Sequence, residues 1–256
     1  MNDISVYPVR AFQDNYVWTL RRGGDAVVVD PGDARPVLAY LRAQNLRLTA
    51  ILNTHHHADH VGGNVELLAN FKVPVYGPHD DRIPTVSHRM RDGESFTLPA
   101  IGLELKVFEI PAHTRSHIAF YGAGMLYCGD TLFACGCGRL FEGTPAQMHA
   151  SLSKLAALPS DTRVYCGHEY TMANIKFARA VDTANEDLIR WEQAAAALRA
   201  SDEATVPSTL AQEMGANPFM RCDQPAVIAA ASRHAGTPLT TPVSVLGALR
   251  EWKNNF

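Results

Sequence analysis

Four histidines and one aspartate fall within six consecutive residues of this chain, a composition that neither a protein core nor an ordinary surface requires. The segment reads Thr54-His55-His56-His57-Ala58-Asp59-His60. Imidazole nitrogen is a favoured ligand of zinc and iron, and a carboxylate adds a harder oxygen ligand. This dense mixture of the two predicts a metal site.

Three more residues of ligand type follow the same local pattern elsewhere in the chain. His113, Asp130 and His168 each come after an apolar run that ends in small residues. Residues 48–54, before the histidine segment, also form an apolar run typical of a buried strand. Ligands in open α/β sheets gather at the carboxyl ends of strands, so we expect these side chains to meet there.

The full set resembles the ligand pattern of the metallo-β-lactamase superfamily. The resemblance implies an α/β fold, an αβ/βα four-layer sandwich of two mixed sheets. It also implies two divalent metal ions, with zinc expected first and iron or manganese as alternatives. One ion would be bound by His55, His57 and His113, the other by Asp59, His60 and His168, with Asp130 as the bridge.

Two ions roughly 3.5–4 Å apart can share one water and lower its pKa enough to give hydroxide near neutral pH. A purely structural zinc site is the alternative, and it needs only four closed ligands. The seven candidate ligands of this chain exceed that number. We therefore expect a catalytic centre with positions left open for a substrate.

Segments outside the ligand set resemble one family of this superfamily, the hydroxyacylglutathione hydrolases or glyoxalase II enzymes. The resemblance runs from about residue 4 to the carboxyl end, and its clearest segments are residues 12–18, 129–133, 136–139, 142–144, 166–171, 205–208 and 217–221. It implies a catalytic domain at residues 1–170 and a helical substrate-binding domain at 171–256. The implied substrate is an S-(2-hydroxyacyl)glutathione, typically S-D-lactoylglutathione, hydrolysed to a 2-hydroxy acid and glutathione in the second step of methylglyoxal detoxification.

The family pattern also implies which residues bind the glutathione part of the substrate. The matching positions are Arg139, Phe141, Tyr170, Arg250 and Lys253. Glutathione carries two carboxylates, and a guanidinium can bind a carboxylate through two hydrogen bonds. Arg139 replaces a lysine of some members and keeps the charge, whereas Phe141 replaces a tyrosine and offers no hydroxyl.

The resemblance implies catalytic roles for Asp59 and Asp130 as ligands of the ions that hold the attacking hydroxide. Asp59 would also orient that hydroxide. The leaving group is a thiolate, whose conjugate acid has a pKa of about 8.5 by analogy with cysteine, so no strong general acid is needed. His56 and His117 have no ligand role in the pattern, and Cys135 and Cys137 are expected to be structural.

The sequence leaves two other functions open. One is a glutathione persulfide dioxygenase of the same superfamily, which would use a single iron. The other is a metal- or glutathione-binding module without catalysis. Retention of all seven ligand types favours the hydrolase over both.

Composition agrees with a globular enzyme of 256 residues, 46% hydrophobic and 19% charged. The formal charge of -3 gives no electrostatic reason to expect a nucleic acid partner. We find neither a signal peptide pattern nor an apolar run of about 18 residues, and five cysteines are too few for a disulfide scaffold. We expect a cytoplasmic monomer whose partner is its small-molecule substrate, without a membrane partner.

Secondary structure patterns change along the chain. Runs rich in β-branched and aromatic residues predict strands at residues 4–9, 16–20, 26–29, 48–54, 103–110, 118–121, 125–128 and 163–166. Helical patterns are expected at residues 34–44, 65–69, 145–158, 172–182, 186–200, 225–234 and 243–253. The result is a mixed α/β part followed by a helical part.

Overall fold

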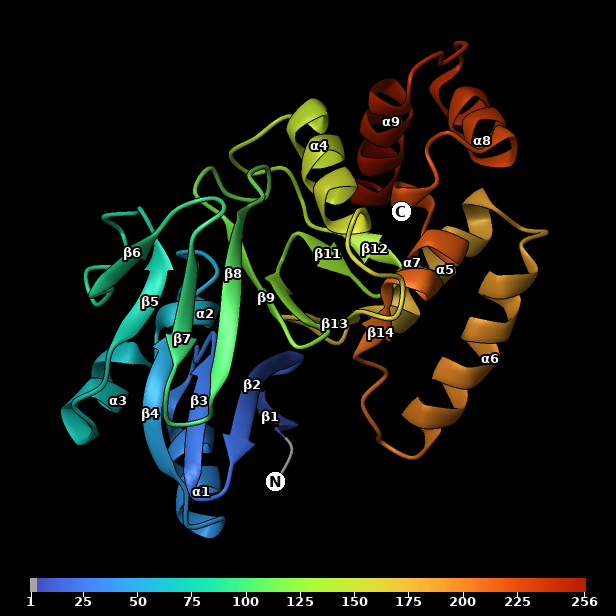
Figure 1. Ribbon diagram of the computed structural model, residues 1–256. Coiled ribbons are helices and arrows are strands. Elements are labelled where there is room, and N and C mark those ends of the chain that lie inside the picture. Colours follow the sequence, from blue (N-terminus) through green and yellow to red (C-terminus); the bar gives the residue numbers. More distant parts are fainter. Residues whose placement is uncertain (1–3) are drawn as a thin grey trace. The chain divides into compact units, whose positions relative to one another are not determined.

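The computed structural model describes residues 4–256, and this part of the chain forms two compact units (Figure 1). The first unit runs to Glu109 and adds Ser116–Gly129. The second unit consists of Ile110–Arg115 and Asp130–Phe256. The chain therefore crosses between the units more than once, and each unit is described by itself.

The first unit contains a mixed sheet in the order β1-β2-β3-β4-β5-β6. β1, β2 and β3 pair antiparallel, whereas β3 to β6 run parallel. The bounds are β1 Ser5–Ala11, β2 Asn15–Arg22, β3 Asp25–Val29, β4 Arg47–Leu52, β5 Val75–Pro78 and β6 His88–Met90. Parallel strands are usually buried on both faces, which explains the continuous apolar runs of β3 and β4.

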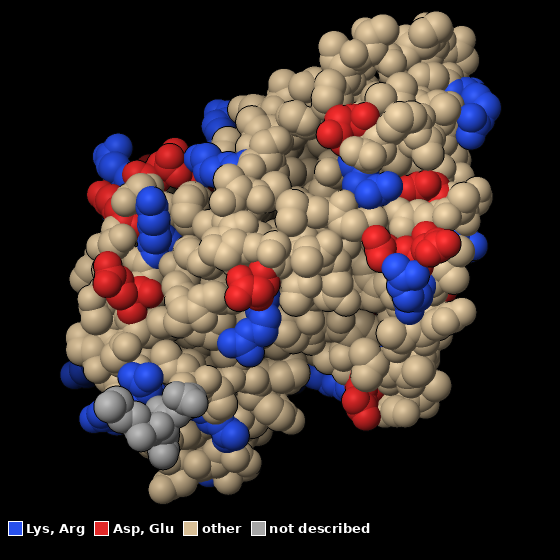
Figure 2. Space-filling view, turned by 45° about the vertical axis from the view of Figure 1, so that its right-hand side comes forward, with Lys and Arg blue, Asp and Glu red and all other residues tan. Residues whose placement is uncertain are grey.

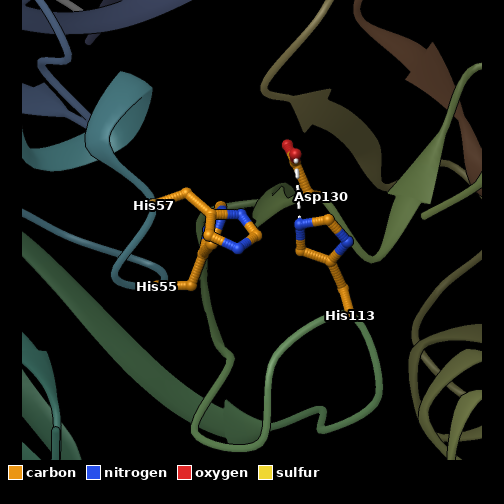
Figure 3. A group of neighbouring side chains, drawn as sticks. All are labelled: His55, His57, His113 and Asp130. Atoms are coloured by element: carbon orange, nitrogen blue, oxygen red, sulfur yellow. Dashed lines mark hydrogen bonds and ion pairs between the residues drawn. The ribbon is translucent and has the colours of Figure 1, made fainter. Parts of the chain in front are cut away.

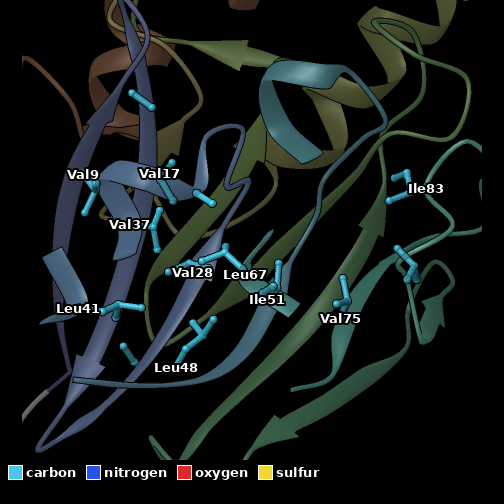
Figure 4. Packing of buried hydrophobic residues seen from close by; sticks show 14 residues of the cluster. Val9, Val17, Val28, Val37, Leu41, Leu48, Ile51, Leu67, Val75 and Ile83 are labelled. Atoms are coloured by element: carbon cyan, nitrogen blue, oxygen red, sulfur yellow. The ribbon is translucent and has the colours of Figure 1, made fainter. Parts of the chain in front are cut away.

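The core of this sheet is built from valine, leucine and isoleucine side chains of the strands and of two helices (Figure 4). Val37 and Leu41 come from α1 (Ala34–Ala43), and Leu67 comes from α3 (Asn64–Asn70). Asp33 begins α1 as its N-cap, with its carboxylate accepting from the backbone N–H of Arg35. Burial of this apolar face fixes the sheet and thus the loops at its strand ends.

Four further strands of the first unit form an antiparallel meander, β7-β8-β9-β10. Their bounds are β7 Ser95–Leu98, β8 Leu103–Glu109, β9 Ile118–Gly122 and β10 Met125–Gly129. The two-residue turn between β9 and β10 has positive φ at both Ala123 (49°) and Gly124 (71°). This is the type I′ pattern, whose twist matches that of a hairpin.

The second unit is mainly helical, with two small strand pairs, β11–β12 and β13–β14. α4 begins at the capping box of Thr144 and Gln147, with Pro145 in its first turn. The elements are β11 Leu132–Phe133, β12 Gly136–Cys137, α4 Pro145–Ala156, β13 Arg163–Cys166, α5 Thr171–Val181, α6 Glu186–Ala200, β14 Ser208–Thr209, α7 Leu210–Ala216, a 3₁₀ turn Pro218–Met220, α8 Pro225–Ala235 and α9 Pro242–Asn254.

α9 packs against α4 and α8, and α5 packs against α6 and α8. Phe177 of α5 contacts the rings of Phe219 and Trp252, which gives this unit an aromatic core. Every strand and helix expected from the sequence is present, with ends that differ by a few residues. The short strands β5, β6, β7, β11, β12 and β14, the helices α2 (Ala58–Val61) and α7, and the 3₁₀ turn were not expected.

No helix within residues 4–256 has both the length and the apolar character needed to span a bilayer. On the face drawn in Figure 2, acidic and basic side chains are interspersed. The division into domains at residues 1–170 and 171–256 remains a prediction.

Candidate metal centre

The histidine segment of the first unit lies where β4 ends and the short helix α2 (Ala58–Val61) begins. His57 is the N-cap of α2, and Asp59 and His60 lie in its single turn. His55 and His60 are buried, whereas His57 and Asp59 are half-buried. A Cβ at Gly32 would lie 1.9 Å from the carbonyl oxygen of Asp59, so glycine is required there for the close approach of this turn.

His55 and His57 direct ring nitrogens at each other. The distance from His55 Nε2 to His57 Nδ1 is 3.0 Å, and the ring planes are 82° apart. Two nitrogens bound to one tetrahedral zinc at roughly 2.0–2.1 Å would be about 3.3 Å apart. The pair therefore has close to the spacing of two ligands of one ion.

Asp30, which follows β3, was not among the residues singled out from the sequence, but the structure places it next to the histidine segment. Its carboxylate accepts from the N–H of Thr54 (2.7 Å), from Thr54 Oγ1 (2.6 Å) and from His60 Nδ1 (3.1 Å). His55 Nδ1 lies 3.0 Å from the same Thr54 Oγ1, which can accept its proton. With Nδ1 of His55 and of His60 engaged in this network, Nε2 of each ring is the nitrogen that could bind a metal ion.

Asp59 is oriented by Asn15, at the start of β2. Asn15 Nδ2 donates to Asp59 Oδ2 (3.0 Å) and to the Asp59 carbonyl (3.3 Å). The Asp59 carboxylate oxygen lies 3.6 Å from His60 Nε2. These contacts place the Asp59 carboxylate and His60 Nε2 together.

The two remaining histidines near the segment contact other partners. His56 Nδ1 lies 3.7 Å from the carboxylate of Asp80. The ring of His117 stacks on His55 at 4.6 Å, and its Nδ1 is 3.1 Å from the carbonyl of Ile118. Neither belongs to a potential ligand group among the described residues, and the absence of a ligand role for both stays a prediction.

Asp130 is the centre of the ligand arrangement in the second unit. Its Oδ2 lies 3.4 Å from His113 Nε2 and 3.4 Å from His168 Nε2. His113 Nδ1 is 3.0 Å from the carbonyl of Arg139, which accepts its proton, so Nε2 is the nitrogen that could bind a metal ion. Figure 3 draws His113 and Asp130 of this unit, together with His55 and His57 of the first.

A close backbone approach keeps these ligands in place. A Cβ at Gly138 would lie 1.9 Å from the Asp130 carbonyl oxygen and 3.0 Å from His113 Nδ1. The ring of His168 stacks on Tyr170 at 4.6 Å and meets the ring of Phe133 edge-on at 5.9 Å. The backbone and ring contacts thus hold all three candidate ligand side chains of this unit.

Three of the residues predicted to bind glutathione are close to these ligands. Phe141 is 61% exposed, and its ring lies 5.3 Å from that of His113. Arg139 is exposed, and its carbonyl contacts His113. Tyr170 is half-buried against His168.

Arg250 and Lys253 of α9 point into the second unit. Arg250 is only 5% exposed, and its Nη1 donates to the carbonyl of Cys137 (2.8 Å). Lys253 Nζ donates to Asn174 Oδ1, and burial, with a further contribution from Arg250, lowers the pKa of Lys253 to about 8. The sequence pattern did not indicate these inward contacts.

The five cysteines are all free and buried. Burial raises the pKa of the Cys135 and Cys137 thiols, so both stay protonated at neutral pH. This agrees with the structural role expected for the pair.

Comparison with known proteins gives two family matches that together cover nearly the whole chain. Residues 12–168 match the metallo-beta-lactamase superfamily, and residues 169–256 match the hydroxyacylglutathione hydrolase C-terminus. A curated hydroxyacylglutathione hydrolase from Nitrosomonas eutropha is 54% identical over 253 residues, covering 99% of both chains.

Solved structures agree on the fold. The BLEG-1 B3 metallo-beta-lactamase has a TM-score of 0.61 and 25% identity, covering 85% of this chain and 99% of that one. TTHA1623, crystallised in a di-iron-bound form, has a TM-score of 0.56 and 31% identity, covering 64% and 92%. The chain therefore has the metallo-β-lactamase fold of two mixed sheets faced by helices, with a helical region at its carboxyl end.

Proposed function

This chain belongs to the hydroxyacylglutathione hydrolase family of the metallo-β-lactamase superfamily, and we propose that seven of its side chains bind two divalent metal ions at which the thioester is hydrolysed. The protein is a thioester hydrolase that acts on hydroxyacylglutathione. The observation that carries the proposal is the arrangement of imidazole nitrogens around Asp130 Oδ2.

The donor set fits metal ions better than it fits hydrogen bonds alone. Asp130 Oδ2 lies 3.4 Å from two imidazole nitrogens, longer than the ~2.7–2.9 Å of a charge-assisted hydrogen bond. It is close to the roughly 3.3 Å that separates two ligand atoms of a tetrahedral ion. The opposite nitrogens of His60 and His113 are satisfied by Asp30 and by the Arg139 carbonyl.

The assignment of ligands follows the resemblance. His55, His57 and His113 would bind one ion, and Asp59, His60 and His168 the other, with Asp130 shared. When bound, the two ions supply an activated water and polarise the thioester carbonyl. Asp59, held by Asn15, would orient that water toward the carbonyl carbon.

The residues near the ligands suggest how the substrate is held. We assign Arg139 to a glutathione carboxylate and Tyr170 to a polar group of the peptide, with the exposed ring of Phe141 packing on the substrate. Arg250 and Lys253 supply positive charge from α9 to the same end of the substrate. The released glutathione thiolate leaves without help from a strong acid, because its conjugate acid has a pKa of about 8.5.

Zinc is the ion we propose first, with iron or manganese as alternatives. Mixed nitrogen and oxygen ligands accept all three, and metal supply often decides between them. The di-iron form of TTHA1623 supports iron as a real alternative. A cytoplasmic location and a monomeric state complete the proposal as predictions.

The test measures hydrolysis of S-D-lactoylglutathione through the loss of thioester absorbance. The metal content of the same preparation is determined in parallel. We expect two metal ions per chain, loss of turnover after chelation and its return on addition of zinc or manganese. Thioester turnover at full rate in a chain stripped of metal would overturn the proposal. Oxygen uptake with glutathione persulfide, at one iron per chain, would favour the dioxygenase instead.

A further inference from the structure

The β11–β12 hairpin, residues 132–137, adjoins every ligand of the second unit. Asp130 precedes the hairpin by two residues. The ring of His168 contacts the ring of Phe133, which lies in the first strand of the hairpin. Arg139 follows it by two residues and accepts from His113 Nδ1. Gly138 N donates to the carbonyl of Thr131 (3.1 Å), which closes the base of the hairpin. The position of the hairpin thus influences the positions of the three candidate ligands, Asp130, His113 and His168.

The turn of this hairpin is poorly suited to support itself. It consists of Ala134 and Cys135, and of these two only Cys135 has a positive φ (58°). Two-residue hairpins favour type I′ or II′ turns, which need a positive φ at the first turn residue. A cysteine with left-handed backbone also carries a conformational cost that glycine would avoid. The turn must therefore be held from outside.

Side chains of the C-terminal region hold one backbone group of each of the residues 134–137, which form the turn and the strand β12. Asn174 Nδ2 donates to the Ala134 carbonyl (2.9 Å), and the Cys135 N–H donates to Glu213 Oε2 (3.0 Å). Asn217 Nδ2 donates to the Gly136 carbonyl (2.9 Å), and Arg250 Nη1 donates to the Cys137 carbonyl (2.8 Å). These four residues come from α5, α7, the Asn217 cap and α9.

Glu213 and Asn217 form the centre of this support. Asn217 Nδ2 also donates to Glu213 Oε2 (2.9 Å), and Ser208 Oγ donates to Glu213 Oε1 (2.5 Å). Glu213 is fully buried, and burial of a carboxylate is unfavourable unless hydrogen bonds satisfy its oxygens, as they do here. Asn217 opens the segment 217–221, which the family pattern singled out and for which the proposed mechanism has no use.

We propose that Glu213 and Asn217 are positioning residues that hold the β11–β12 hairpin so that Asp130, His113 and His168 keep the geometry needed to bind metal. The inference rests on the proposed function, because it takes Asp130 as the bridging ligand. Neither residue touches the substrate. They act on the centre only through the backbone of residues 134–137.

The test compares Glu213→Ala, Glu213→Gln and Asn217→Ala with the wild-type protein. Glutamine can accept from the Cys135 N–H and the Asn217 amide with its oxygen and donate to Ser208 with its nitrogen. We therefore expect Glu213→Gln to keep near-normal kcat and near-normal affinity for cobalt(II), which serves as the metal probe. In the two alanine variants, kcat, cobalt affinity or both should fall by about 10- to 100-fold, as is usual when the groups behind metal ligands are removed.

Cobalt(II) provides a readout that does not depend on turnover. Cobalt is titrated into the metal-free protein, and its visible absorption reports the coordination of each ion. Both alanine variants are expected to show an altered spectrum and weaker binding at a temperature where each is folded. A folded Glu213→Ala protein with the wild-type cobalt spectrum and kcat would overturn the inference.

Asn185→Ala is the matched control. Asn185 is a helix-capping asparagine of the same unit, whose Nδ2 donates to the Gly215 carbonyl (2.9 Å), but it does not contact the hairpin. It should lower the unfolding temperature while leaving the cobalt spectrum and kcat unchanged; if it changes them as Glu213→Ala does, general destabilisation explains the result and the inference falls.

Replacement variants and the metal content of the wild-type protein distinguish misfolding, failure of the proposed function and failure of the present inference. If Glu213→Ala does not fold, Asn217→Ala and Asn174→Ala, which each remove a hydrogen bond to a carbonyl of the hairpin, take its place. If the wild-type protein itself binds fewer than two cobalt ions, the proposed function fails. If it binds two and the alanine variants do the same with wild-type affinity and spectrum, only the present inference fails.

Discussion

At the scale of single residues, the partner of one ring nitrogen decides what the other nitrogen can do. His60 Nδ1 contacts Asp30, and His113 Nδ1 contacts the Arg139 carbonyl, so each presents Nε2. His57 differs, since its Nδ1 is the atom that faces His55. A histidine-to-glutamine change at any of these positions would therefore remove a specific ligand atom as well as a ring.

The ligand types could be predicted from sequence because they follow strand ends in short apolar contexts. Asp30 also follows a strand, β3, so the same reasoning could have been applied to it. Glu213 offered no such signal. It lies in a helix among ordinary helical residues, and only the tertiary fold shows that it is buried.

Asp130→Ala gives the most direct test at this scale. Removal of the shared carboxylate should abolish binding of two ions and reduce kcat by at least about 100-fold, since a bridging ligand contributes to both ions. Metal content and kcat are measured on the same sample. An alanine variant that retains two ions per chain and normal turnover would show that Asp130 is not the bridge.

Lys253 predicts a pH dependence of substrate binding. Its pKa of about 8 means that it is mostly protonated at pH 7 and mostly neutral at pH 9. If it contributes charge to glutathione binding, KM should rise several-fold over this range with a smaller change in kcat. Lys253→Arg keeps its charge and should give a flatter profile. Parallel KM profiles for the two proteins would remove Lys253 from the substrate site.

At the scale of elements, periodicity predicted the long strands and helices well. α6 was expected at residues 186–200 and is found at Glu186–Ala200. The short strands β11 and β12 were not expected, because two residues carry no periodic pattern and side chains from distant helices stabilise their turn. These strands were missed because they are stabilised by contacts between residues that are distant in sequence.

The β9–β10 turn offers a test of backbone strain that is independent of the metal centre. Ala123 is exposed and adopts φ 49° in a type I′ turn, where asparagine is preferred. Ala123→Asn should raise the free energy of unfolding by roughly 1 kcal/mol, the scale of the left-handed penalty for alanine. Thermal unfolding measures this, and kcat should not change. A lower unfolding temperature would contradict the turn assignment.

At the scale of the whole molecule, the stability of the protein should depend on the protonation of Glu213. Burial raises its pKa from 4.5 to about 7, against the opposing effect of hydrogen bonds from Ser208 and Asn217. The folded protein therefore binds more protons than the unfolded chain between about pH 4.5 and 7. Stability must fall as pH rises through this window and level off above pH 7.

Glu213→Gln should remove this dependence because glutamine does not titrate. The free energy of unfolding of the wild-type protein, relative to Glu213→Gln, should fall by about 3 kcal/mol between pH 4.5 and 8, from 1.36 kcal/mol per pKa unit. Urea unfolding at several pH values measures the difference. Equal slopes for the two proteins would show that Glu213 has an ordinary pKa in the folded state.

The burial of all five cysteines has a consequence for how this protein withstands its chemical surroundings. Buried sulfhydryls are inaccessible to alkylating agents and aldehydes and therefore react slowly with them. Iodoacetamide should therefore label the native molecule hardly at all and label it fully once the fold opens, so that mass gain would record each opening event.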